Sequence, residues 1–403
     1  MNRIGDDELL DLESRGCFDY FWREANTDRT SPGYGLVRDR APSLPGMASI
    51  AAVGFGLAAL AIGAERGWVT PDEAEERAIG TIETCLTHAE QRRGFFFHFL
   101  DLHTGRAYGN SEVSIIDSAI AVCGMLTAGE YFGGEVRRLA EAVYRRVEWD
   151  WFRDPRTNLF YMGYNDRTQA HFGAWDHYAE QLMIYFLAAA SPTHPVPASM
   201  YEEFRRDSGR FGGEPFIHSE SGALFVYQFS HAWFDLRGRR DKSGIDWFAN
   251  SVEASRASRR YAMERTHRFR GFGADSWGLT ACDGPSGYNG SYGALPNRIG
   301  EKLVDGTVPP CGAAGSLVFT PTEALAALRH YYEDLPELWG PYGFHDAFNL
   351  EVKPAWFAPD AIGIDKGITL LMAENYRSAL IWKLFGRCSH AVRGVSRCLD
   401  EEN

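Results

Sequence analysis

The longest apolar run of the chain reads MASIAAVGFGLAALAIGA and extends from Met47 to Ala64. It carries no charged side chain, it contains Gly54 and Gly56, and it falls short of the about 20 residues that span a bilayer comfortably. We therefore predict a helix buried in the core of the protein and no membrane partner.

Helical patterns recur on both sides of this run. Thr70-Pro71-Asp72-Glu73 combines a capping Thr, a first-turn Pro and a Glu at the third position, and it predicts a helix that continues to about Ala89. Further helices are predicted over residues 7–24, 47–65, 112–130, 134–149, 174–190, 198–206, 224–235, 241–263, 320–335 and 359–386. Strand-like alternation is scarce, so the fold class is all-α.

The predicted helices differ in charge. Residues 47–64 and 112–125 are nearly uncharged, whereas residues 70–89 and 134–149 carry many charges. Such a contrast is typical of a ring of helical hairpins, in which inner helices are buried on every side and outer helices face solvent. We expect an (α/α)6 barrel, a toroid of helical hairpins, formed as a single domain over residues 1–403, because no linker or fixed-period repeat divides the chain.

Composition limits the function classes. The formal charge of −13 argues against a nucleic-acid partner. Aromatic residues make up 14% of the chain, with eleven Trp, which suits a protein that stacks on carbohydrate. The seven cysteines form no CxxC pair and the histidines show no HExxH spacing, so neither a metal nor a cofactor is expected.

The N-terminus lacks an apolar leader, which predicts a cytoplasmic location for the chain as given, or a periplasmic one if a leader has been removed.

The loop FGADSWGLTACDGPSGY, residues 272–288, mixes glycines, carboxylates and large aromatics. Trp277 and Tyr288 offer flat faces for sugar rings, Asp283 can accept hydroxyl hydrogens, and glycine lets the backbone approach a ligand. A surface turn cluster is the alternative. The loops that contain Asp39 and Asp346 share this composition, and together they predict an aromatic-lined cleft at one end of the helical ring.

Hydrolysis of a glycosidic bond requires two carboxyl groups, one to protonate the leaving oxygen and one to activate water. Glu180 stands at the head of an otherwise apolar helix, where desolvation raises the pKa of an acid. Asp365 lies between glycines at the mouth of a second apolar helix, where it can hold a water. The alternatives are a helix-start acid for Glu180 and an ion pair with Lys366 for Asp365.

Glu112 and Asp117 are a third pair of candidates. They lie five residues apart and point about 140° from each other on a helix, so both meet one ligand only if Glu112 is at the helix mouth. A helix cap and a buried, hydrogen-bonded acid are the alternatives. Glu374 continues the helix of Asp365 and can line the same cavity or support it.

Five motifs occur in the order seen in the bacterial glucoamylase-like family, which this chain resembles over nearly its whole length. They are GLVRDR (35–40), GFFFHF (94–99), SEVSIID (111–117), GLTA with GPSGY (278–288) and GIDKG (363–367). That family contains β-1,2-glucan hydrolases and is similar to a central domain of cyclic β-1,2-glucan synthases. The resemblance implies an (α/α)6 barrel, inverting hydrolysis of a β-glucan, and Glu180 as general acid.

The predicted catalytic residues are Glu180, Asp365 and Glu112, and the predicted substrate-binding residues are Arg38, Asp39, Asp117, Trp277, Asp283, Tyr288, Asp346 and Glu374. The expected partner is an oligosaccharide or polysaccharide. Three other functions stay open on the residues alone. They are a transglycosylase with a closer carboxylate pair, a non-catalytic glycan-binding protein, and a sugar epimerase that uses histidines as acid and base.

Overall fold

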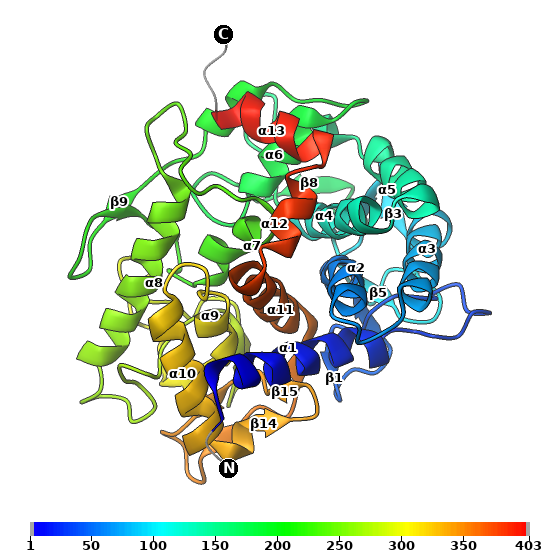
Figure 1. Ribbon diagram of the computed structural model, residues 1–403. Coiled ribbons are helices and arrows are strands. Elements are labelled where there is room, and N and C mark those ends of the chain that lie inside the picture. The colour runs from blue at the N-terminus through cyan, green and yellow to red at the C-terminus, as the bar shows by residue number, and fades with distance from the viewer. Residues whose placement is uncertain (1–3, 400–403) are drawn as a thin grey trace.

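The computed structural model describes residues 4–399, and within them the chain is rich in helix (Figure 1). The helices are α1 (Asp6–Arg23), α2 (Ile50–Glu65), α3 (Pro71–Thr87), α4 (Ile115–Phe132), α5 (Gly134–Arg146), α6 (Leu182–Ala190), α7 (Phe225–Trp233), α8 (Trp247–Glu264), α9 (Pro310–Ala314), α10 (Pro321–Asp334), α11 (Gly363–Arg377), α12 (Leu380–Phe385) and α13 (Ser389–Leu399). Three 3-10 helices, η1 (Trp149–Phe152), η2 (Ala198–Glu202) and η3 (Pro336–Leu338), join them. The predominance of helix that the sequence predicts is confirmed.

The strands are short and all pair antiparallel. They are β1 (Arg40–Ala41), β2 (Met47–Ser49), β3 (Gln91–Arg92), β4 (Phe95–Phe96), β5 (Phe99–Asp101), β6 (Val113–Ser114), β7 (Gly163–Asn165), β8 (Ala170–Phe172), β9 (Ser208–Gly209), β10 (Phe216–Ile217), β11 (Cys282–Gly284), β12 (Gly287–Asn289), β13 (Thr307–Val308), β14 (Trp339–Gly340), β15 (Gly343–Phe344), β16 (Phe348–Asn349), β17 (Trp356–Phe357) and β18 (Ala361–Ile362). None exceeds three residues, so they connect helices rather than form a core sheet.

The helices separate into buried and half-exposed sets. Helix α2 packs against α4 and α11, and each of its residues except Glu65 is buried. Helix α6 is buried over its whole length. In Figure 1, α3 and α5 lie outside α2 and α4, and α13 lies outside α6, which it contacts. The uncharged stretches of the sequence are therefore the core helices, as predicted.

Two glycines bring α2 and α4 into backbone contact. A Cβ on Gly124 of α4 would lie 1.8 Å from the carbonyl oxygen of Gly54, and a Cβ on Gly54 would lie 2.4 Å from the carbonyl oxygen of Ile120. Only residues without side chains allow two helices to approach this closely. Within residues 4–399, α4 is also the one helix whose length and composition would let it cross a membrane, and 72% of it is buried inside the protein.

Short strands lead directly into the core helices. Strand β2 precedes α2, β6 precedes α4, β13 leads into α9 and β18 precedes α11. Ser49 and Ser114 end their strands and cap the following helices, since their hydroxyls accept hydrogen bonds from the amides of Ala52 and Asp117. The predicted helices over 47–65 and 112–130 therefore each begin three residues later than expected, because a paired strand occupies residues at their start.

Three predicted helices differ from the structure in more than their first residues. Residues 174–181 are not helical, because the Gln181 side chain accepts from the Ala179 amide and donates to the His177 carbonyl, which holds a turn ahead of α6. The predicted helix at 198–206 is the 3-10 helix η2. The predicted helix at 359–386 is divided into α11 and α12, since Ala379 has a left-handed backbone with φ of 56°. Helices α9 and α13 were not predicted.

The contact between α2 and α4 makes a prediction about stability. Replacing Gly54 with Ala forces a methyl group against the α4 backbone, and we expect the free energy of unfolding to fall by at least about 2 kcal/mol in urea denaturation. Gly56→Ala in the same helix is the matched control, because its methyl would meet only the side-chain ends of Val37 and Phe21, at 3.1 and 3.3 Å. Its expected change is within about 1 kcal/mol. Equal losses in both variants would contradict the backbone contact.

Candidate active site

The candidate site forms around the first turns of α4 and α11. Asp117 and Asp365 are each the third residue of their helix. The Ser114 hydroxyl donates to Asp117 Oδ2 at 2.5 Å. The partial positive charge of a helix N-terminus favours carboxylates at this position. Two acids predicted from the sequence thus occupy equivalent positions in two helices that both pack against α2.

His98 links two of the predicted acids. Its Nδ1 lies 2.9 Å from Glu112 Oε1, and its Nε2 lies 3.6 Å from Asp117 Oδ1. Burial alone would lower the pKa of His98, but the negative charges of Asp117, Glu112 and Asp39 outweigh it and raise the pKa to about 9. His98 is therefore a cation at neutral pH.

The same contact sets the ionisation of Glu112. Burial would raise the pKa of Glu112, but the hydrogen bond and charge of His98 hold it below the usual range. Glu112 is consequently ionised near neutral pH. It suits an anionic role in the site, and it is poorly suited to donate a proton.

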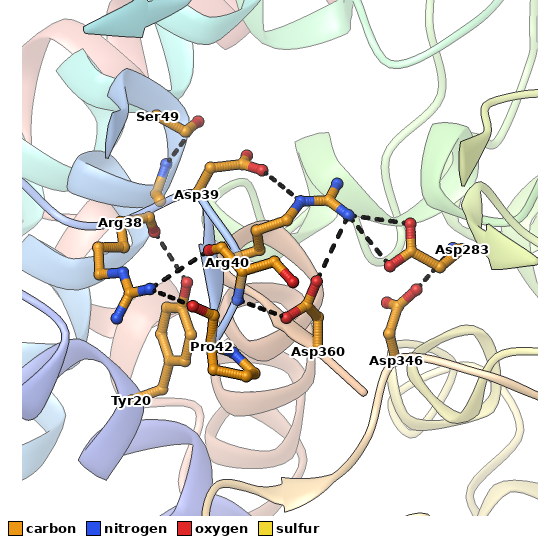
Figure 2. Close-up of polar contacts among 11 residues, drawn as sticks. Tyr20, Arg38, Asp39, Arg40, Pro42, Ser49, Asp283, Asp346 and Asp360 are labelled. Carbon is orange, nitrogen blue, oxygen red and sulfur yellow. Dashed lines mark hydrogen bonds and ion pairs between the residues drawn. The ribbon is translucent and has the colours of Figure 1, made fainter. Parts of the chain in front are cut away.

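Arg40 gathers carboxylates from distant segments (Figure 2). Its Nε donates to Asp39 Oδ2 at 3.1 Å, and its Nη1 donates to both carboxylate oxygens of Asp283, each at 3.0 Å. Nη1 also lies 3.9 Å from Asp360 Oδ2. Burial raises the pKa of Asp39, against the charge of Arg40. Asp39 and Asp283, both predicted to bind substrate, are thus held on one guanidinium.

Asp346 and Asp365 form a buried pair beside this cluster. Asp346 Oδ2 accepts the Asp283 amide at 2.7 Å, and Asp365 Oδ1 accepts the Cys311 thiol at 3.2 Å. Burial and the charge of Asp365 raise the pKa of Asp346 well above the usual range, while burial raises the pKa of Asp365 to about 6. One proton on Asp346 can therefore join its Oδ1 to Asp365 Oδ2, two buried oxygens that have no other hydrogen-bond partner in the described chain.

Lys366 is not the ion-pair partner of Asp365. Its ammonium group lies 3.1 Å from Glu13 Oε1 and also donates to the Phe344 carbonyl. The alternative of a simple pair between neighbours is therefore wrong. A cavity of about 10 Å³ lies between Lys366, Cys311, Asp346 and Asp365, close to the smallest space that holds one water.

Glu180 lies in the turn that leads into α6. The Ser230 hydroxyl of α7 donates to the Glu180 carbonyl at 2.8 Å and accepts the Met183 amide at 3.1 Å, which fixes the turn against α7. Burial raises the pKa of Glu180 to about 7, and the negative charge of Asp117 adds to the rise. The side chain keeps partial solvent access. Glu180 can thus carry a proton at neutral pH and exchange it with a ligand.

Tyr288 of the β11–β12 hairpin has an open ring beside Arg40. The residue is 48% exposed, and the Arg40 guanidinium carbon lies 5.8 Å from the ring centre. Burial of its hydroxyl end and the charges of Asp365 and Asp346 raise the pKa of Tyr288 well above the usual range. One end of the side chain therefore lies among the acids, while the ring remains available for stacking.

Three predicted substrate-binding residues lie elsewhere. Trp277 is 1% exposed and its backbone is bonded to the Tyr331 hydroxyl, so its ring has no open face. Arg38 binds Glu24 at 2.5 Å and the Pro42 carbonyl at 2.8 Å, and Figure 2 shows its guanidinium directed away from that of Arg40. Glu374 is bound by Arg66 and lies nine residues beyond Asp365 on α11, which is about 14 Å along a helix. None of these three side chains joins the cluster around Arg40, and their role in binding substrate stays a prediction.

Four site residues escaped the sequence analysis: Arg40, His98, Cys311 and Asp360. Arg40 and His98 stand inside two of the quoted motifs, GLVRDR and GFFFHF. The spacing of His98 from other histidines does not suit a metal site, but a histidine among carboxylates also serves as their counter-charge. Cys311 and Asp360 carry no recognisable signal in the sequence.

Known proteins resemble the chain in both sequence and structure. The profile of the family Glycoamylase, described as putative glucoamylase, matches residues 173–389. The exo β-1,2-glucooligosaccharide sophorohydrolase (non-reducing end) of Parabacteroides distasonis is 29% identical over 434 aligned positions, which cover 97% of this chain and 58% of that protein. The chain thus spans well under two thirds of this relative's length.

Two solved structures match almost end to end. A putative glucoamylase from Bacteroides uniformis superposes with a TM-score of 0.89 at 29% identity and covers 99% of this chain and 98% of its own. An endo-β-1,2-glucanase from Chitinophaga pinensis, in complex with sophorotriose and glucose, gives 0.87 at 28% identity, with 98% and 99% covered. The likeness therefore includes the part of the chain before residue 173, which the family profile does not match and which holds Asp39, His98 and Glu112.

The charge on His98 predicts a pH dependence of stability. Its pKa is about 9 in the folded chain and 6.5 for the unperturbed side chain. The folded state therefore holds this proton more tightly, and the stabilisation is complete below about pH 6.5 and is lost as the pH rises through about 9. Wild-type protein should lose up to about 3 kcal/mol more unfolding free energy than His98→Gln between these limits, measured by urea denaturation. Parallel pH curves for the two proteins would refute the assignment.

Proposed function

The chain belongs to the putative glucoamylase family, and on that premise we propose that it is a glycoside hydrolase that cleaves β-1,2-glucan or its oligosaccharides by inverting acid–base catalysis. The printed activities of the sophorohydrolase and the endo-β-1,2-glucanase support this substrate class. The buried and charged helix sets support the finer description of the fold as an (α/α)6 barrel. The single catalytic domain would extend over residues 1–403.

One observation carries the proposal: the pKa of Glu180 is raised to about 7, while the pKa of Glu112 is held below its usual range. Carboxyl groups with separated pKa values are what a glycosidase needs, since one must give a proton while others stay ionised. Glu180 is accordingly the general acid. Ionised Glu112, paired with His98, contributes negative charge that stabilises an oxocarbenium-like transition state.

Asp365 is the proposed general base. Its pKa of about 6 keeps Asp365 ionised at neutral pH. The proton held by Asp346 can form a hydrogen bond to Asp365, and Asp365 then remains an anion. In an inverting reaction Asp365 removes a proton from water as the water oxygen attacks the anomeric carbon. Glu180 gives its proton to the glycosidic oxygen as that bond breaks. Asp39, Asp117 and Asp283 accept hydrogen bonds from sugar hydroxyls, and Tyr288 stacks on a ring.

The substrate class is tested with a panel of glucans. The protein is incubated with β-1,2-, β-1,3-, β-1,4- and α-linked glucans, and products are sized and their anomeric form is followed by NMR. We expect cleavage of the β-1,2-linked substrate alone, with inversion at the anomeric carbon. Products longer than the substrate would instead favour a transglycosylase, and binding without cleavage would favour a glycan-binding protein.

The role of Glu180 predicts how leaving groups respond to its loss. Glu180→Gln keeps the shape of the side chain but cannot give a proton, so kcat should fall by at least about 10²-fold on a natural glucan. The fall should be smaller on a substrate with an activated phenolic leaving group, which needs less protonation. Asp365→Asn is the matched comparison and should impair both substrates alike, because each needs attack by water. An equal loss on both substrates for Glu180→Gln would remove Glu180 from the role of acid.

A further inference from the structure

Arg40 has one nitrogen that the protein does not use. Nε and Nη1 donate to Asp39 and Asp283, but no residue of the described chain accepts a hydrogen bond from Nη2 (Figure 2). Nη2 is not among the sealed polar atoms that lack partners, and the side chain is 17% exposed. Nη2 therefore keeps some contact with solvent at the edge of the candidate site.

We propose that Arg40 binds the substrate directly, with Nη2 donating hydrogen bonds to neighbouring hydroxyl oxygens of the glucose unit that stacks on Tyr288. This assignment rests on the proposed function and adds a recognition group to that site. The Arg40 guanidinium carbon lies 5.8 Å from the Tyr288 ring centre, so one sugar unit can meet the ring with its face and Nη2 with its edge. In the motif GLVRDR, the arginine that contacts the ligand is then Arg40, whereas the sequence predicted Arg38.

The surroundings of Arg40 fix Nη2 before a ligand arrives. Bonds to Asp39 on one edge and to Asp283 on the other hold the planar guanidinium in a single orientation. A donor fixed in advance loses little entropy on binding. Its charge is balanced by carboxylates, and hydrogen bonds from an ionised donor are about twice as strong as those between neutral groups.

A second arginine in the chain shows what a purely structural arrangement looks like. Arg265 also joins two carboxylates beside a tyrosine, with its guanidinium carbon 4.8 Å from the Tyr261 ring centre and its side chain 19% exposed. Its Nε and Nη2 donate to Glu301 and its Nη1 donates to Glu264. Every guanidinium nitrogen of Arg265 is thus used within the protein. Arg40 differs in the free Nη2 and in the half-exposed Tyr288 ring beside it.

The test compares Arg40→Lys with Arg265→Lys. Lysine keeps the charge but cannot hold two carboxylates and still present Nη2, so Arg40→Lys should raise KM for β-1,2-glucan by about 10-fold or more and lower kcat much less. In a Glu180→Gln background, which binds without cleaving, the Kd for sophorotriose measured by calorimetry should rise by the same factor. Arg265→Lys should lower Tm about as much as Arg40→Lys does, because each variant loses bonds to two carboxylates. Its KM should stay within about twofold of the wild-type value.

Several outcomes would overturn the assignment. An unchanged KM and Kd in Arg40→Lys would mean that Arg40 only holds its carboxylates. If that variant does not fold, a crystal structure of Glu180→Gln with sophorotriose decides the matter, since Nη2 should lie about 2.7–3.2 Å from a sugar oxygen. A separation above about 4 Å from every sugar oxygen would refute the contact. A failure of the proposed function has a different result, because the wild-type protein would then cleave no β-1,2-linked glucan.

Discussion

Backbone hydrogen bonds between short strands hold the first turns of the core helices together, and the site depends on this arrangement. Strand β1 pairs with β18, directly before α11, and Arg38 bridges Ala48 of β2, directly before α2. Strand β2 pairs with β5, and Phe97 bridges Val113 of β6, directly before α4. This chain of pairings carries Asp39, Arg40 and His98 to the ends of the helices that bear Asp117 and Asp365. Without these strand pairings, the composition of the helices alone would not bring the acids of one helix close to those of another.

The site contains more carboxylates than cations, and their neighbours give each a different state. His98 keeps Glu112 ionised, burial favours the protonated form of Glu180, and burial together with the charge of Asp365 favours a proton on Asp346. Arg40 compensates Asp39 and Asp283. A cluster of identical side chains thus becomes a set of distinct acids and anions, because burial and charge act differently over a few ångströms.

Local patterns in the sequence predicted much of the fold. The Thr70 capping box marks the start of α3 in the structure, and the uncharged runs are the buried helices α2 and α4. The raised pKa expected for Glu180 follows from its apolar surroundings and agrees with the structure. These features depend on residues close in sequence, which is why a sequence read without its fold can reach them.

The features that the sequence could not predict depend on side-chain partners that lie far away along the chain. Arg38 and Arg40 stand two residues apart, but one binds Glu24, 14 residues away, and the other binds Asp283, 243 residues away. Trp277 and Tyr288 share one loop, yet the Tyr331 hydroxyl of α10 ties down the backbone of Trp277 where it is buried, while the ring of Tyr288 stays open. These distant partners decide whether a side chain is available to a ligand or is bound within the protein. The residue type alone does not predict which of the two applies.

The pairing of β1 with β18 also bears on how such enzymes can diversify by recombination. Asp39 and Arg40 come from the first tenth of the chain, whereas Asp283, Asp360 and Asp365 come from its last third. Helix α1 packs against α11 as well, so segments more than 300 residues apart form one interlocked piece. A chimera of two homologues with a crossover in the middle would join an arginine from one parent to acids from the other. Exchange of an outer helix such as α3 or α5 would leave this charge network within one parent.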